Sequence, residues 1–289
     1  MTEQFTHDQF MALALKQASY GQLIARPNPA VGCVLVKDNK VVGAGFTQEA
    51  GGPHAEVMAM RAAGDLAVGS TAYVTLEPCS HYGRTPPCSL SLIEAGVSCL
   101  VYGCQDPNPQ VSGQGLAQLR AANVEVVGPV MQAECEMSNV GFLQRMGTFK
   151  PYVINKMAMS LDGRTAMESG ESQWITSAES RAQVHLLRAQ SCAVITGIGS
   201  VLRDDPSMNV RADELALAGV PQATIDRIQQ PLRVVLDSQL RLPVSARLVQ
   251  QNGPVLVVTC VVDPKQHQSL VSAGVEVVVC AADDNGKVD

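Results

Sequence analysis

Short apolar runs alternate with segments of helical periodicity along this chain, and that order limits the possible fold more than any other feature. Two apolar runs, residues 30–38 and 40–47, are joined by the polar sequence KDNK, which predicts a β-hairpin. Predicted helices at 54–65, 88–96 and 113–123 then alternate with predicted buried strands at 71–77, 98–104 and 124–128. With a first helix over 7–21, this order predicts a three-layer α/β unit that extends to about residue 130.

A second unit in βαβ-like order follows. Residues 131–150 have the pattern of a helix that runs into Pro151, and we interpret this helix as a bridge between two domains. The elements expected after it are a strand at 152–160, a turn at 161–163, a helix at 177–190, a loop at 203–209 and strands at 192–197, 231–238, 253–262 and 275–280. The sequence therefore predicts two α/β domains, residues 1–149 and 150–289.

Charge and cysteine content exclude several classes of protein. The net charge of −6 argues against a nucleic-acid partner, which usually requires a basic face. No apolar run approaches the ~20 residues of a membrane-spanning helix, and the polar, acidic start is unlike a secretory signal. Nine scattered cysteines without an export signal favour a reduced, cytoplasmic protein, in which clustered cysteines are candidate metal ligands.

Two short clusters supply metal ligands and a proton carrier. His54 offers an imidazole, while Cys79 and Cys88 offer thiolates, and this set suits Zn²⁺ with one tetrahedral position left open for a water that the metal acidifies. Glu56 lies two residues from His54 at the start of a predicted helix. A carboxylate there can take a proton from that water and pass it to a leaving amine.

The order H-x-E … P-C … C is the signature of zinc-dependent nucleobase deaminases. Its usual second half is P-C-x-x-C, whereas eight residues, SHYGRTPP, separate Cys79 from Cys88 here. A core histidine beside a surface glutamate, with cysteines that act as small apolar residues, is the alternative interpretation. Because all four residues occur in the expected order and structural context, the pattern predicts a zinc deaminase.

The long spacer between Cys79 and Cys88 helps to distinguish among zinc-dependent deaminases. The segments PNPAVGCVLV, AGGPHAEV, YVTLEPCSH, CSHYGRTPPC and DPNPQVSGQG resemble the deaminase domain of the bifunctional riboflavin-biosynthesis proteins, which join a diaminohydroxyphosphoribosylaminopyrimidine deaminase to a 5-amino-6-(5-phosphoribosylamino)uracil reductase. This resemblance implies a cytidine-deaminase-like fold in which His54, Cys79 and Cys88 hold zinc and Glu56 carries the proton. It also implies that Asn28 contacts the pyrimidine, and that His81 and Arg84 meet the base or the ribose phosphate.

The residues themselves leave alternatives for these substrate contacts. Arg84 suits a phosphate, but it can equally be a solvated surface arginine. Asn28 between two prolines can be a turn residue. One position departs from the family pattern, since members commonly carry a histidine where this chain has Thr47. Thr47 can still donate a hydrogen bond, but a charged contact to the substrate would be lost.

The segments KMAMSLDGRTAMESGESQWITS and RDDPSMNVR resemble the reductase domain of the same proteins, whose fold is similar to dihydrofolate reductase and which uses NADPH. The resemblance implies an NADPH site lined by Ala158, Trp174, Ser200, Asp204 and Ser238, and a substrate site lined by Ser172, Arg188, Met208 and Arg211. Taken singly, Trp174 can be a core residue, Asp204 a turn cap and Arg188 a solvated helix residue. Arg188 and Arg211 together make sense as a phosphate clamp. The chain has no G-x-G-x-x-G motif, so a Rossmann site is not expected.

The resemblance implies riboflavin biosynthesis as the function, a phosphorylated pyrimidine as the substrate and a homo-oligomer, either dimer or tetramer. The family's reductase domain continues beyond the point that corresponds to Asp289, so we expect a C-terminally incomplete, impaired reductase if Asp289 is the true end, and a bifunctional native protein if it is not. Two other hypotheses stay open at this point: a zinc deaminase of another nucleobase or nucleotide, and a non-catalytic module with structural zinc. The absence of a fourth nearby cysteine or histidine argues against the second.

Overall fold

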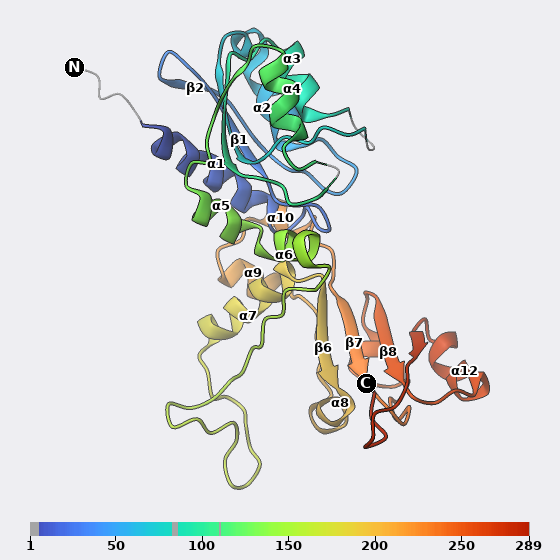
Figure 1. Ribbon diagram of the computed structural model, residues 1–289. Helices are drawn as coiled ribbons and strands as arrows, with labels where there is room; N and C mark the ends of the chain where they lie inside the picture. Colours follow the sequence, from blue (N-terminus) through green and yellow to red (C-terminus); the bar gives the residue numbers. More distant parts are fainter. Residues whose placement is uncertain (1–5, 83–85, 110, 289) are drawn as a thin grey trace. The chain divides into compact units, whose positions relative to one another are not determined.

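A computed structural model describes residues 6–82, 86–109 and 111–288 of the chain. It divides into two compact units, Met1–Asn155 and Lys156–Asp289, which are described separately (Figure 1). Every helix in the described ranges is too short or too polar to cross a membrane. The domain limits expected from the sequence, 1–149 and 150–289, stay a prediction.

The first unit is built on a five-stranded sheet in the order β2-β1-β3-β4-β5. Its strands are β1 (Gly32–Lys37), β2 (Lys40–Phe46), β3 (Thr71–Leu76), β4 (Cys99–Cys104) and β5 (Glu125–Val127). The predicted hairpin is confirmed: β1 and β2 pair antiparallel, and Asp38 and Asn39 between them both have positive φ, as the tightest hairpin turns require. β1 is also antiparallel to β3, whereas β3, β4 and β5 are parallel.

Helices cover both faces of this sheet, so the predicted three-layer arrangement is confirmed (Figure 1). The helices are α1 (His7–Gly21), α2 (Ala55–Ala63), α3 (Cys88–Glu94), α4 (Gln114–Ala121), α5 (Gln132–Ser138) and α6 (Val140–Thr148), with a 3₁₀ turn at Gly64–Ala67. Glycines in the strands allow the helices to pack closest to the sheet. A Cβ on Gly32 of β1 would lie 1.9 Å from Ala14 O of α1, and one on Gly45 of β2 would lie 2.6 Å from Ala55 O of α2.

Strand directions gather four chain segments at one edge of the sheet. Because β1 runs antiparallel to β2 and β3, its amino end lies beside the carboxyl ends of both, and the carboxyl end of β4 lies there too. The segments that begin or end at this edge are residues 28–31, 47–54, 77–88 and 105–113. They include Asn28, His54, Cys79, His81 and Cys88, and Glu56 follows in the first turn of α2.

The second unit has a parallel four-stranded sheet in the order β6-β7-β8-β9. Its strands are β6 (Ala193–Gly197), β7 (Leu232–Leu236), β8 (Val255–Thr259) and β9 (Glu276–Val279). Its helices are α7 (Ala178–Gln190), α8 (Ile198–Asp204), α9 (Ala212–Leu217), α10 (Gln222–Ile225), α11 (Arg247–Gln250) and α12 (Pro264–Ser272). Val235, Val257, Leu248 and Leu270 form the centre of its core.

Two predicted elements are wrong. Residues 152–160 form no strand; their side chains, among them Val153, Ile154 and Met157, are largely exposed, and no described strand pairs with them. An alternating apolar pattern specifies a strand only when a neighbouring strand satisfies its backbone. The expected bridge helix over 131–150 is two helices, α5 and α6, because Asn139 between them has non-helical dihedral angles (φ −131°, ψ 27°). The sequence reasoning also missed α8 to α12.

Candidate active sites

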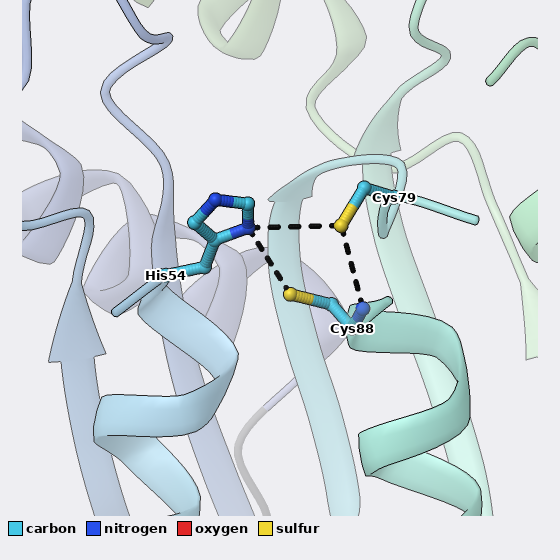
Figure 2. A group of neighbouring side chains, drawn as sticks. All are labelled: His54, Cys79 and Cys88. Carbon is cyan, nitrogen blue, oxygen red and sulfur yellow. Dashed lines mark hydrogen bonds between the residues drawn. The ribbon is translucent and has the colours of Figure 1, made fainter. Parts of the chain in front are cut away.

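The structure brings His54, Cys79 and Cys88 together at the edge of the sheet where β3 ends (Figure 2). Their ligand atoms all lie within 4.8 Å of one another. His54 Nδ1 is 3.6 Å from Cys79 Sγ and 3.3 Å from Cys88 Sγ. A tetrahedral Zn²⁺ ion with ordinary bond lengths would hold a nitrogen and a sulfur ligand about 3.6 Å apart. One imidazole and two thiols at this spacing therefore fit zinc.

Each of the three residues stands at the end of a regular element. His54 is the N-cap residue of α2, Cys79 follows Pro78 beyond β3, and Cys88 is the first residue of α3. The Cys88 N–H donates to Cys79 Sγ at 3.3 Å, so the amino end of α3 already stabilises negative charge on that sulfur. Cys79 and Cys88 therefore lie next to each other although eight residues separate them in the sequence.

Helix α4 and Glu77 support the turn that carries Cys79. A Cβ on Gly115, in the first turn of α4, would lie 2.1 Å from Pro78 O, so this helix can approach the turn only without a side chain there. Glu77 is buried, and its Oε2 accepts a hydrogen bond of 3.0 Å from Gly113 N at the start of α4. These contacts tie the turn to the helix.

Glu56 lies in the first turn of α2 and is only 3% exposed. Burial, and next the negative charge of Cys79, raise the pKa of its carboxyl group to about 7. The carboxyl also shares a hydrogen bond with the Cys88 side chain. Glu56 is therefore a buried acid that can gain or lose a proton near neutral pH beside the three-ligand group.

The two thiols share one proton. A hydrogen bond from Cys88 lowers the pKa of Cys79 to about 4, and the same bond together with burial raises the pKa of Cys88 well above its ordinary value. Because zinc ligands must be deprotonated, a bound cation would stabilise both thiolates and release that proton.

The predicted substrate contacts of the first unit differ in exposure. Asn28 is half-buried in the loop between α1 and β1, and His81 is exposed beyond Cys79. Arg84 lies outside the described residues. Thr47 is 3% exposed, and its Oγ1 accepts a hydrogen bond of 3.0 Å from Val31 N. The hydroxyl of Thr47 thus supports the backbone of the first unit and is turned away from solvent.

In the second unit, three predicted substrate residues lie together. Arg188 of α7 donates from Nη1 to Asn209 O at 3.2 Å, which joins α7 to the segment between Met208 and Arg211. Burial, and next the charge of Arg211, lower the pKa of Arg188. Two guanidinium groups near each other attract an anion, and Glu214, whose Oε1 lies 3.6 Å from Arg211 Nη1, offsets part of their charge.

His185 is a part of this cluster that the sequence reasoning missed. It is 3% exposed, and its Nδ1 accepts a hydrogen bond of 3.2 Å from Arg211 N. Burial, then the charges of Arg188 and Arg211, lower its pKa to about 4. His185 is thus neutral at physiological pH and holds the Arg211 backbone.

The predicted cofactor residues fall into two groups. Ser200 lies in the first turn of α8, directly after β6, and Ser238 follows β7, so both lie at the carboxyl ends of neighbouring parallel strands, while Asp204 is the last residue of α8. This edge is where α/β sheets bind ligands. Ala158 and Trp174, with the predicted substrate residue Ser172, lie in the irregular segment before α7. Trp174 is exposed, and the guanidinium of Arg181 stacks 4.3 Å from its ring centre.

Comparison with known proteins identifies both units. Residues 5–104 match the family model of the cytidine and deoxycytidylate deaminase zinc-binding region, and residues 151–289 match the RibD C-terminal domain. Over 249 residues, 85% of this chain, the sequence is 54% identical to the riboflavin biosynthesis protein RibD of Escherichia coli and covers 67% of it. This chain belongs to the RibD family.

Solved RibD structures agree. One form of Acinetobacter baumannii RibD superposes with a TM-score of 0.86 at 45% identity, covering 95% of this chain and 74% of that one. A Thermotoga maritima diaminohydroxyphosphoribosylaminopyrimidine deaminase/5-amino-6-(5-phosphoribosylamino)uracil reductase superposes with a TM-score of 0.81 at 35% identity, covering 94% and 74%. The chain thus spans about two thirds to three quarters of the length of these relatives.

Family membership confirms the predicted fold class, a cytidine-deaminase-like domain followed by a dihydrofolate-reductase-like one. It also confirms the predicted activity: the chain is a riboflavin biosynthesis enzyme with a zinc-dependent deaminase domain and a reductase domain that uses NADPH. The roles assigned to individual residues stay predictions.

Proposed function

We propose that the first unit hydrolytically deaminates 2,5-diamino-6-ribosylamino-4(3H)-pyrimidinone 5′-phosphate, and that the second unit reduces the ribosyl side chain of the product with NADPH. The observation that carries the first part is the group of His54, Cys79 and Cys88 with buried Glu56 beside it. Its donor set and spacing suit Zn²⁺, which at such a site acidifies a water molecule.

Glu56 carries the protons in this mechanism. Deamination replaces an amino group by a carbonyl oxygen, so one water is consumed and one ammonia leaves. The Glu56 carboxylate accepts a proton from the attacking water and then, as the carboxylic acid, donates it to the departing amine. A pKa of about 7 suits a group that must act first as base and then as acid near neutral pH. Burial keeps bulk water from competing for that proton.

Ammonia release from the phosphorylated pyrimidine tests this proposal. We expect the zinc-loaded chain to be active and Glu56→Gln to lose at least about a thousandfold in kcat while it keeps its zinc, because the variant has the same size but no proton carrier. Glu94→Gln, at the exposed end of α3, is the matched control and should behave like the unchanged chain. Zinc loss in Glu56→Gln would instead make Glu56 a ligand, and full activity would exclude it as the proton carrier.

The proposed reductase site rests on Arg188 and Arg211. Two neighbouring cations, one of them half-buried, suit the phosphate of the deaminated intermediate. NADPH oxidation by the chain supplied with this intermediate measures the second activity. We also propose that the protein is cytoplasmic and forms a homo-oligomer, as its resemblance to the family implies; light scattering on the purified chain measures the oligomer.

A further inference from the structure

The backbone that follows Asn28 is held by buried side chains from three separate parts of the first unit. Three consecutive amides donate to them: Ala30 N to Asn139 Oδ1 at 2.8 Å, Val31 N to Thr47 Oγ1 at 3.0 Å and Gly32 N to Thr75 Oγ1 at 3.1 Å. Side-chain acceptors at three successive positions leave this loop little freedom, because each buried amide would lose its partner if the backbone moved.

Asn139 makes the most complete of these contacts. Besides accepting from Ala30 N, its Nδ2 donates to Ala30 O at 3.0 Å, so one amide side chain pairs with both polar groups of one residue. Asn139 is 7% exposed and Ala30 is 6% exposed, so water cannot replace either bond easily. The two residues are 109 positions apart in the sequence.

The break between α5 and α6 puts Asn139 in reach of the loop. Cys135 of α5 is fully buried against β4, where a Cβ on Gly103 would lie 2.2 Å from its Sγ. Gln22, just after α1, donates from Nε2 to Ser138 O at 3.3 Å. The segment that the sequence suggested as a bridge is therefore anchored on the deaminase sheet and on α1.

We propose that Asn139 is a positioning residue of the deaminase, which fixes the loop so that Asn28 meets the pyrimidine. Asn139 lies outside both matched regions, 5–104 and 151–289. The loop ends at the sheet edge where β3 leads to Cys79, because β1 and β3 are antiparallel. This inference rests on the proposed function, in which Asn28 contacts the substrate.

A double-mutant cycle on the zinc-loaded chain of 289 residues tests the proposal by ammonia release. Asn139→Ala removes both bonds to Ala30, and Asn139→Asp keeps the size and the acceptor but loses the donor. We expect both variants to raise KM about tenfold, because a displaced Asn28 loses its hydrogen bond to the substrate and one ordinary hydrogen bond supplies about that factor. The kcat should stay within about threefold, and the zinc content should not change. Asn28→Ala should raise KM similarly, and adding Asn139→Ala to it should change KM by less than about twofold.

Gln144→Ala is the matched control. Gln144 lies on α6, which follows Asn139, and its side-chain amide donates to Pro151 O, away from the loop of Asn28, so the KM of this variant should not change. Three results would overturn the inference: multiplied effects in the double variant, lower kcat at constant KM in both Asn139 variants, or a raised KM in Asn139→Ala but not in Asn28→Ala. The second result is what a merely smaller fraction of folded enzyme would give. An unchanged chain that releases no ammonia would overturn the proposed function, and this inference with it.

Discussion

The close approach of α4 to the turn before Cys79 predicts that Gly115→Ala damages the zinc site from outside it. The new Cβ would lie 2.1 Å from Pro78 O, so α4 and the turn before Cys79 would have to separate by about 1 Å. Overpacking of this kind costs about 1–3 kcal/mol, of which better helix propensity recovers at most about 1 kcal/mol. We expect a net loss of about 1–2 kcal/mol in the unfolding free energy of the first unit.

Zinc affinity should fall more clearly than stability. Zinc–ligand distances tolerate deviations of only about 0.2 Å, and a shift of Pro78 moves Cys79 directly. Changes to the groups that support metal ligands cost about 10–100-fold in affinity, and we expect a loss in this range. Competition with a chromophoric chelator measures zinc affinity, and urea unfolding measures stability.

Gly147→Ala is the control for this experiment. A Cβ on Gly147 of α6 would lie 3.9 Å from Pro107 Cβ, an ordinary contact, so this helix should gain up to about 1 kcal/mol while zinc affinity stays constant. Unchanged zinc affinity and stability in Gly115→Ala would show that α4 does not support the Cys79 turn, and the reasoning from close approach would be wrong.

Two predictions concern the second unit. Its stability should fall in acid, because the pKa of His185 is about 4 in the folded chain and about 6.5 in the unfolded chain. Between these pH values the unfolded state binds more protons than the folded state. The unfolding free energy should therefore decrease by up to about 3 kcal/mol as the pH falls from 6.5 to 4. His185→Asn keeps the acceptor for Arg211 N, so urea unfolding at pH 7 and 4.5 should show less acid sensitivity, and an equal loss in both proteins would contradict the assignment. Arg211→Ala should raise KM for the phosphorylated intermediate about 10–100-fold in the NADPH assay, whereas exposed Arg241→Ala should not; equal effects would exclude a specific clamp.

The elements of the first unit could be predicted because their signals are local. Asp38 and Asn39 fix the hairpin turn, and the order of apolar runs fixes the sequence of strands and helices. His54, Cys79 and Cys88 could be predicted as one site because a metal needs a particular set of ligands, so residue type and spacing carry the information.

Long-range partners could not be predicted. The segment 152–160 has the composition of a strand, but only a neighbouring strand would make it one. Asn139 within a helical pattern carries no signal that its side chain pairs with Ala30. His185 on α7 likewise gives no sign in the sequence of the two arginines that keep it neutral. In each case a residue distant in the sequence determines the structure or the protonation state.

Glu77 and Asp106 are intermediate between residues with a local signal and residues identified only by a distant partner, since strand topology could have found them. Each follows a buried strand, β3 or β4, and these strands are parallel, so both carboxyl groups lie at the edge that holds Cys79. Both are buried, and burial raises the pKa of each. Asp106 also interacts electrostatically with His81 and Cys79. Burying an acid costs free energy unless hydrogen bonds or opposite charges compensate it, so an acidic residue directly after a buried parallel strand points to the edge at which the sheet binds its ligand.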